Sequence, residues 1–309
     1  FPTDQKKLLD ANPAGVFQPT ASGRMESALY GSVRMAMKGG KLWPSFHEGI
    51  DIAAMRRDRS RRPLDPVYAV AGGEVAYINR TSGNSNYGVY VALAHQDPAG
   101  KVYTLYAHLA SVAPGLRVGQ AVRPGDCIGV MGHSSSSAIP IERAHLHFEV
   151  GLITNGRFSE WFRANKLKPD HGLYNGRNLL AIDPLGVFRE RLSDPSFSIL
   201  KHLNTLPVAY EVVLSSRRLP DYFRRYPQLW QGAPHDGGPL VLVCADNGVP
   251  LRGRNASEEE RARLGRNRHL VQNVNANVLG KNGRRLVVCD QRGWRLGQNG
   301  DEWLAILCY

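Results

Sequence analysis

The segment "AHLHFEV", residues 144–150, sets two histidines two positions apart in an otherwise apolar run. As a β-strand this segment alternates, so its apolar residues face one side and its polar residues face the other. The polar face carries His145, His147 and Glu149. Two adjacent imidazoles suit a metal or acid–base site, and the alternative is a half-exposed strand whose polar face holds histidine without a function.

The segment "FHEGIDIAA", residues 46–54, has a similar pattern. As one strand it places His47 and Asp51 on the same face, because side chains four positions apart in a strand point the same way. Gly49 between them would leave room for an ion or a ligand. Histidine and a carboxylate are suitable zinc ligands, although two ligands alone do not make a site.

The segment "YTLYAHLA", residues 103–110, adds a third histidine. As a strand it places Tyr106 and His108 on one face. The chain thus contains His-x-x-x-Asp, Tyr-x-His-Leu and His-x-His in that order. Three protein ligands and an open position for water are the composition of a hydrolytic zinc site, so these motifs together indicate a metal hydrolase.

The order of the motifs resembles the lysostaphin/LytM-type zinc metallopeptidases of bacterial cell-wall metabolism. The resemblance covers about residues 27–152 and includes the glycines and turn positions between the motifs. It begins near "YGSVR" (30–34). It continues through "HEGIDIA", "VYAVAGGEVAYI", "YGVYVALAH", "YTLYAHL", "VGQAVRPGDCIGVMGHS" and "HLHFEV".

The resemblance also implies roles for five residues. His47, Asp51 and His147 would bind one zinc ion, and His108 and His145 would be the two catalytic histidines. One imidazole would accept a proton from the activated water and deliver it to the leaving amine. The other would hydrogen-bond the carbonyl oxygen as negative charge develops there. All five positions hold the residue type that the family has, so the sequence shows no sign of a degenerate site.

The resemblance implies a zinc metalloendopeptidase that hydrolyses amide bonds in bacterial peptidoglycan, in a stem peptide or a cross-link. Its partner would be peptidoglycan or another anionic cell-wall polymer, and its location periplasmic or extracellular, although no leader is visible in this chain. Two alternatives stay open. One is a catalytically silent wall-binding or amidase-regulating module, and the other is a zinc peptidase that acts on a protein target.

The pattern of the chain predicts a mainly β protein with a smaller α+β part at its end. Short strands separated by turns predict an antiparallel β-sandwich or barrel-like catalytic domain. We expect an N-terminal arm at residues 1–26, extended or made of short elements packed on a neighbour. The zinc metallopeptidase domain would follow at 27–189, and an α+β domain of unknown role at 190–309. In this last part we interpret "EWLAILCY" (302–309) as a strand.

The net charge of +12 favours an anionic partner, which could be nucleic acid, an anionic lipid surface or an acidic wall polymer. Charge alone suggests a nucleic-acid or anionic-surface binder as a rival function, but we expect no specific nucleic-acid partner. The arginine-rich "RRDRSRR" (56–62) is interpreted as a solvated loop. No run approaches the roughly 18 apolar residues of a membrane span, so we expect no transmembrane segment.

Four cysteines in 309 residues do not make a disulfide framework. Cys127 lies in the apolar run "GDCIGV" and is expected to be buried. One bridge among Cys244, Cys289 and Cys308 stays open. The absence of CxxC pairs speaks against a structural cysteine–zinc site.

Overall fold

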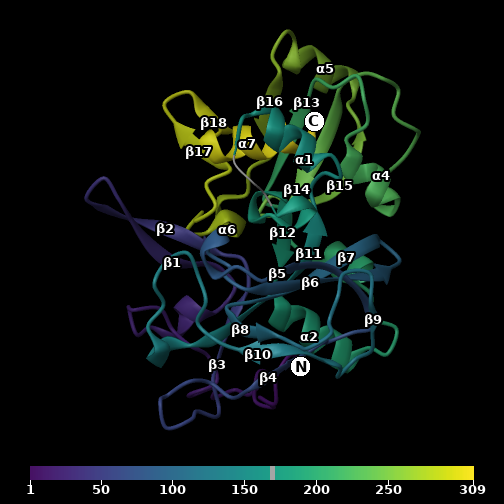
Figure 1. Cartoon of the computed structure of the whole chain (residues 1–309). Helices are drawn as coiled ribbons and strands as arrows, with labels where there is room; N and C mark the ends of the chain where they lie inside the picture. The colour runs from purple at the N-terminus through teal and green to yellow at the C-terminus, as the bar shows by residue number, and fades with distance from the viewer. Residues whose placement is uncertain (168–170) are drawn as a thin grey trace.

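Antiparallel sheets dominate the computed structural model, which describes residues 1–167 and 171–309 (Figure 1). Residues 168–170, within the expected metallopeptidase domain, lie outside the described residues. The strands are β1 (Gly31–Lys38), β2 (Lys41–His47), β3 (Ile50–Ala53), β4 (Pro66–Tyr68), β5 (Gly73–Asn79), β6 (Tyr90–Asp97), β7 (Gly100–Ala107), β8 (Leu109–Val112), β9 (Ala121–Val122), β10 (Cys127–Met131), β11 (His145–Ile153), β12 (Leu179–Ile182), β13 (Tyr210–Leu214), β14 (Leu240–Cys244), β15 (Pro250–Asn255), β16 (His269–Gln272), β17 (Val287–Asp290) and β18 (Gly293–Leu296).

The helices are short and lie mostly after β11. The α-helices are α1 (Phe158–Ala164), α2 (Pro184–Ser193), α3 (Ile199–Thr205), α4 (Asp221–Arg225), α5 (Glu258–Leu264), α6 (Ala276–Leu279) and α7 (Gln298–Leu307). The 3-10 turns are η1 (Met25–Ala28), η2 (Ser82–Asn84), η3 (Ile141–Arg143), η4 (Gly172–Tyr174), η5 (Gly176–Asn178) and η6 (Pro227–Leu229). Among the described residues, none of these helices combines the length and hydropathy that a membrane span needs.

A seven-stranded antiparallel sheet forms the centre of the first part of the chain. Its strand order is β12-β11-β7-β6-β5-β9, and β3 pairs with β11 beside this path. A three-stranded sheet, β4-β10-β8, contributes to the same hydrophobic core, in which Val67 and Ile128 join Val91 and Phe148. The expected mainly β architecture with an antiparallel first part is therefore confirmed.

Strand β11 is buried along its whole length. It pairs with β3 through His147 and Asp51, and with β7 through Phe148 and Tyr106. Leu146 and Phe148 join the main core as the alternation predicts. The polar face of the strand is also buried, which contradicts the half-exposed alternative. Buried histidines on a central strand need partners, because an unpaired buried polar group is costly.

The segment 46–54 is not one continuous strand, because β2 ends at His47 and β3 begins at Ile50. A Cβ atom on Gly49 would lie 2.2 Å from the main-chain oxygen of Phe148. Only glycine therefore lets the chain approach β11 this closely. The expectation that Gly49 leaves room for an ion is wrong, since β11 fills that space.

The N-terminal arm lies against the chain's own sheet. The amide of Ala53 donates to the carbonyl of Val16, and the amide of Gln18 donates to the carbonyl of Asp51, each at 2.9 Å. Phe17 between them is buried in the main core. The arm thus covers the edge of β3 that faces away from β11. Its hydrogen bond from Gln18 fixes the position of the main-chain carbonyl of Asp51.

The last part of the chain contains the four-stranded antiparallel sheet β15-β14-β13-β16 together with helices, as expected for an α+β part. The segment 302–309 falls mostly in helix α7, so its interpretation as a strand is wrong. Trp303, Leu304 and Leu307 are buried at spacings that put them on one helical face. A short apolar run fits a strand or a helix equally well, and here the preceding Gly297 opens a helix.

Contacts join the two expected domains across the boundary between them. Helix α2 spans residues 189 and 190. The buried Asn155 side chain donates to the carbonyl of Ile306 at 2.7 Å, and Ile306 packs with Phe158 in one apolar cluster. The division of the chain at this boundary stays a prediction.

All four cysteines are free thiols, so none of the late cysteines forms the disulfide that was left open. Cys127 is exposed, and its expected burial is wrong. It begins β10, where the alternation turns the next residue, Ile128, into the core instead.

A partly buried ion-pair network stabilises helix α5. Ser257 and Glu260 form a capping box, in which each side chain bonds to the other residue's main-chain amide. Both carboxylate oxygens of Glu260 accept from Arg254, at 2.7 and 2.8 Å, and one also accepts from Gln272. The Arg254 hydrogen bonds outweigh burial and lower the pKa of Glu260 from 4.5 to about 2.

We expect Glu260→Gln to reduce the free energy of unfolding by about 2 kcal/mol at neutral pH, since it removes charged hydrogen bonds. The folded-state pKa is the lower one, so the carboxylate stabilises the fold above pH 4.5, and this contribution disappears as the pH falls towards 2. Urea unfolding at several pH values measures both effects. Glu259→Gln, exposed on the same turn, is the control, and an equal loss in both variants would contradict the network.

Candidate functional site

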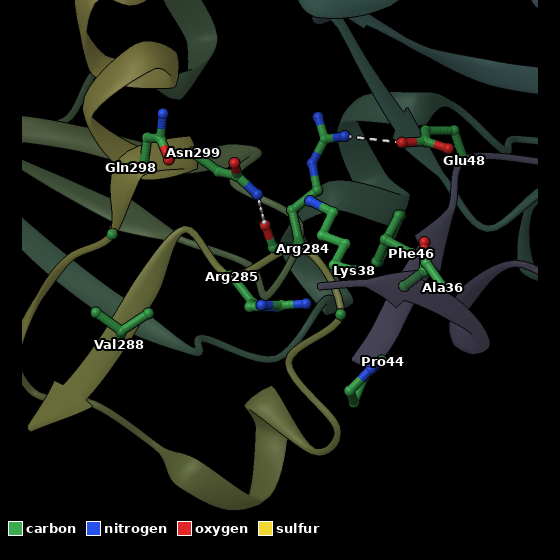
Figure 2. Close-up of a pocket in the computed structure, with 13 residues that line it drawn as sticks. Ala36, Lys38, Pro44, Phe46, Glu48, Arg284, Arg285, Val288, Gln298 and Asn299 are labelled. Atoms are coloured by element: carbon green, nitrogen blue, oxygen red, sulfur yellow. Dashed lines mark hydrogen bonds and ion pairs between the residues drawn. The ribbon is translucent and has the colours of Figure 1, made fainter. Parts of the chain in front are cut away.

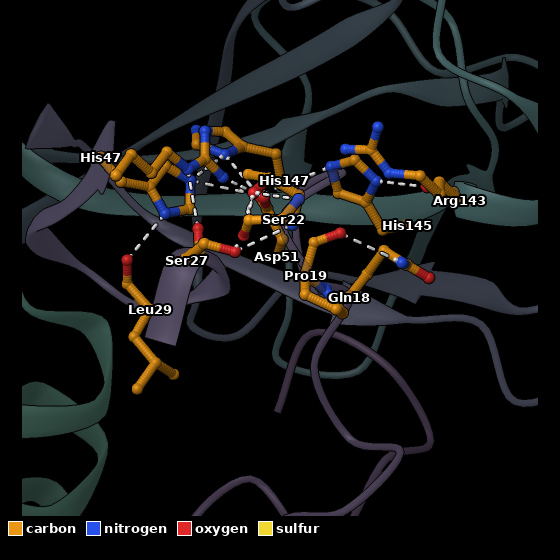
Figure 3. A network of polar contacts seen from close by, with 12 residues as sticks. Gln18, Pro19, Ser22, Ser27, Leu29, His47, Asp51, Arg143, His145 and His147 are labelled. Atoms are coloured by element: carbon orange, nitrogen blue, oxygen red, sulfur yellow. Dashed lines mark hydrogen bonds and ion pairs between the residues drawn. The ribbon is translucent and has the colours of Figure 1, made fainter. Parts of the chain in front are cut away.

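The five residues singled out in the sequence line one groove of about 370 Å³. Figure 3 shows four of them, His47, Asp51, His145 and His147, in their network of polar contacts. They come from four places in the chain: the end of β2, strand β3, the residue after β7, and strand β11. The residues are His47, Asp51, His108, His145 and His147. The pairing of β11 with both β3 and β7 brings these segments together.

Three candidate ligand atoms converge in this groove. Oδ1 of Asp51 lies 3.1 Å from Nε2 of His47 and 2.9 Å from Nδ1 of His147. The two imidazole nitrogens are themselves 3.1 Å apart. Among the described residues, this trio forms a group of buried side chains that could hold a metal ion.

Each imidazole has one nitrogen inside the trio, the inner nitrogen, and one outside it. The hydrogen bond of the outer nitrogen determines whether the inner nitrogen of the neutral ring carries a proton. Nδ1 of His47 lies 2.8 Å from the carbonyl oxygen of Leu29, which can only accept, so this nitrogen carries a proton. Nε2 of His147 lies 2.9 Å from a carboxylate oxygen of Glu149 and donates in the same way. In the neutral rings both inner nitrogens are therefore acceptors. They face a carboxylate oxygen, and this donor set fits a cation such as zinc.

The electrostatics of the trio also favour positive charge at this point. Burial alone would lower the pKa of His147, but its hydrogen bonds to Asp51 and Glu149 and their charges raise this pKa to about 9. Burial alone would raise the pKa of Asp51, but the neighbouring His47 and His145 hold it well below its usual range. A place that draws a proton onto a buried imidazole also attracts a cation.

Glu149 is fully buried behind His147 and is held by two tyrosines. The hydroxyl groups of Tyr87 and Tyr103 donate to its two carboxylate oxygens at 2.7 and 2.8 Å. Burial and the charge of Glu149 raise the pKa of both phenols well above 10, so both stay protonated and donate. Neither tyrosine was predicted as a site residue, because nothing in their spacing connects them to Glu149.

His145 and His108 lie side by side at the groove, with ring centroids 4.8 Å apart. Nδ1 of His145 donates to the carbonyl of Arg143 at 2.7 Å, and Nδ1 of His108 donates to the carbonyl of Ser134 at 2.8 Å. Burial lowers the pKa of His145, and burial together with the charges of His145 and His147 lowers that of His108 to about 3. Both rings are neutral at pH 7, and each has an unprotonated Nε2.

His108 reaches the groove through an unusual backbone conformation. Its φ angle of 60° lies in the left-handed region, which residues other than glycine adopt at a cost of about 1–3 kcal/mol. Tyr106 points into the core against Phe148, and its hydroxyl oxygen accepts a hydrogen bond from the amide of Val70 at 3.0 Å. The expectation that Tyr106 and His108 share a face is wrong, because the left-handed turn after β7 redirects His108.

Arg34 is a groove residue that the site prediction missed. Its guanidinium contacts the second carboxylate oxygen of Asp51, and its Nε donates to the carbonyl of Ser27 at 2.7 Å. It is the last residue of "YGSVR", so the resemblance contained the signal. The contact orients the carboxylate and leaves Oδ1 directed at the two histidines.

The arginine-rich segment 56–62 holds one wall of the groove. Arg57 donates to the carbonyls of Ile141, Glu142 and Ala144, at 2.8 to 3.3 Å. The solvated-loop interpretation is therefore wrong for Arg57, whose guanidinium ties down the turn that leads into β11.

Comparisons with known proteins agree with this geometry. Residues 45–159 match the model of peptidase family M23. The resemblance to the lysostaphin/LytM-type peptidases is therefore confirmed for this part of the chain. No curated protein matches.

Three similar solved structures are a zinc-containing peptidase from Vibrio cholerae, the catalytic domain of the antimicrobial peptidase lysostaphin from Staphylococcus simulans, and a putative glycyl-glycine endopeptidase LytM from Ruminococcus gnavus. Their identities are 24%, 23% and 25%, and their TM-scores 0.30, 0.28 and 0.28. The matches cover 44%, 40% and 45% of this chain, and 36%, 76% and 44% of those chains, respectively. The chain spans about a third of the length of the Vibrio cholerae peptidase.

We expect the purified protein to bind one zinc ion, and His47→Ala or Asp51→Ala to lose it, because each removes one of three ligands. Isothermal titration with zinc after chelator treatment measures the affinity and the stoichiometry. His108→Ala is the matched control, since it removes a groove histidine outside the trio. Full zinc occupancy in either ligand variant would refute the assignment.

We expect Glu149→Gln to weaken zinc binding by about 10–100-fold, because the carboxylate fixes the tautomer of His147 and increases its basicity. The same titration measures the loss. Glu74→Gln, at an exposed position of β5, controls for the change in net charge. Unchanged affinity in Glu149→Gln would show that His147 does not depend on this hydrogen bond.

Proposed function

We propose that this chain is a zinc metalloendopeptidase that hydrolyses amide bonds in bacterial peptidoglycan peptides. In this proposal His47, Asp51 and His147 hold the ion, and His108 and His145 are the catalytic residues. One observation carries it: three buried side chains that could hold a metal ion converge beside two neutral imidazoles with free nitrogens, within the segment that matches the peptidase family.

The ion, when bound, supplies a Lewis acid that makes water a nucleophile at neutral pH. Nε2 of His145 lies 3.5 Å from Oδ1 of Asp51, and so beside the ligand atoms. Since this nitrogen is unprotonated, it can accept the proton of the attacking water and later give it to the leaving amine. The hydrogen bond from Nδ1 to Arg143 keeps the ring in that orientation throughout.

The ring of His108 lies close to those of both His145 and His147 and would hydrogen-bond the substrate's carbonyl oxygen as negative charge develops there. That role requires a proton on Nε2, because Nδ1 already donates to Ser134. One such donor contributes about 3 kcal/mol to transition-state stabilisation. Burial disfavours this second proton in the resting state, and the developing negative charge favours it.

The net charge of +12 supports an anionic wall polymer as partner, because a basic surface concentrates polyanions. Peptidoglycan as substrate implies that the protein works in the periplasm or outside the cell. A wall-binding module without turnover would use the same groove, and a zinc peptidase with a protein target would use the same chemistry. Zinc content and turnover distinguish the first from our proposal, and the choice of substrate distinguishes the second.

We expect the purified protein to cleave defined muropeptides, and a chelator to abolish cleavage, with the products identified by mass spectrometry. His145→Ala and His108→Ala should keep zinc and lose about 10²–10⁴-fold in turnover, as the loss of a proton-transfer or oxyanion group does. His133→Ala is the control, because this exposed histidine bonds to Ile139 on the neighbouring loop and does not line the groove. Rates near the parent's in both catalytic variants would refute their roles.

A further inference from the structure

A second cavity, of about 470 Å³, lies next to the groove (Figure 2). One side of it is formed by the β1–β2 hairpin, with Lys38 and Phe46. The other side is formed by residues 283–285 and the start of helix α7. The late part of the chain, to which the resemblance assigns no role, therefore builds one wall of a cavity beside the candidate active site.

The charges that line this cavity are mostly positive. Its cations are Lys38, Arg284 and Arg285, and its acid is Glu48. Arg284 pairs with Glu48 at 2.8 Å, as the dashed line in Figure 2 shows. Among the described residues, Nε of Arg284 is buried and has no hydrogen-bond partner. Two of the three cations are therefore left without a carboxylate in the cavity.

Arg285 is held in place by stacking on an aromatic ring, and its N–H groups do not pair with any carboxylate of the described residues. Its guanidinium stacks over the ring of Trp43 at 4.5 Å from the ring centroid. No ion pair of Arg285 is found among the residues that the structure describes. A guanidinium stacked in this way keeps its planar set of N–H groups free for a bidentate oxyanion.

The N-terminus of helix α7 adds to the positive potential. Gly297, Gln298 and Asn299 line the cavity, and the N-cap Gly297 has no side chain that could cap the helix. The main-chain amides of the first turn and the helix dipole both favour an anion at this end. The helix end and the arginines thus favour the same kind of ligand.

The cavity is a built part of the fold. A Cβ atom on Gly283 would lie 2.7 Å from the carbonyl carbon of Ser45, so only glycine allows this close approach to β2. The amide of Gly283 also donates to the hydroxyl of Ser32 at 2.9 Å. These contacts place the two arginines against the hairpin.

Glu48 connects the two cavities, because it lines both the groove and the basic cavity. We propose that the basic cavity binds a carboxylate of the peptide whose amide bond lies in the groove. This inference rests on the proposed function for the identity of that peptide, and it makes the enzyme selective for acidic substrates. Arg285 binds the carboxylate, and Lys38 closes the site from the hairpin.

The test measures binding without turnover, in the full chain carrying His145→Ala. The probes are the fluorescein-labelled peptide L-Ala-D-Glu-L-Lys-D-Ala with free carboxylates and the same peptide with all its carboxyl groups amidated. Fluorescence anisotropy gives both affinities. We expect Arg285→Gln to weaken binding of the free peptide about tenfold, as the loss of one charge-assisted pair does, and to leave the amidated peptide unaffected.

Arg59→Gln is the matched control, because it removes the same charge from an exposed position outside both cavities. Should Arg285→Gln fail to fold, Lys38→Gln on the exposed hairpin replaces it, with Lys7→Gln as its control. The proposal would be overturned if the His145→Ala chain bound both peptides equally well. It would also be overturned if the added Arg285→Gln substitution weakened binding of both peptides to the same extent. Binding of inorganic phosphate that depends on Arg285 and is tighter than binding of the free peptide would overturn it as well. Muropeptide turnover is measured separately, so failure of the proposed function is recognised independently.

Discussion

The site depends on one constraint: Oδ1 of Asp51, Nε2 of His47 and Nδ1 of His147 lie about 3 Å apart. In the neutral rings, the proton of each imidazole is on the nitrogen that points away from the other two atoms. Leu29 and Glu149 take the outer protons of His47 and His147, and this leaves the inner nitrogens facing Asp51. Such an arrangement is stable in a protein interior only if positive charge occupies its centre, either as an extra proton or as a metal ion. The sheet pairing, the arm and the buried tyrosines all maintain this geometry.

The sequence predicted the residues of the groove better than it predicted their surroundings. Alternation along 144–150 correctly separated core and site faces, since a central strand obeys the two-residue period strictly. The prediction from alternation failed at His108, where one left-handed residue turns the side chain to the other face. The strand predicted at 302–309 was also wrong, because this short apolar run forms a helix. The partners of Glu149 could not be predicted, because Tyr87 lies in the turn before β6 and Tyr103 in β7, and the sequence does not state how these segments pack against β11.

The same limit applies to the outer wall of the site. Arg34 was within a recognised motif, but its contact with Asp51 depends on how the β1–β2 hairpin folds back. Arg57 was in a charged run that is usually solvated, and its role follows from three carbonyl groups that converge on it. Long-range contacts of this kind require the register of the sheets, and local propensity does not contain it.

The hydrogen bond between Asn155 and Ile306 has a consequence for how the protein is made. Synthesis proceeds from the N-terminus, so the strands around the groove are complete long before Ile306 emerges from the ribosome. Until then the buried amide of Asn155 has no acceptor from Ile306, and the cluster around Phe158 lacks its C-terminal member. A nascent chain that stalls before Ile306 is therefore incompletely packed beside its own strand β11.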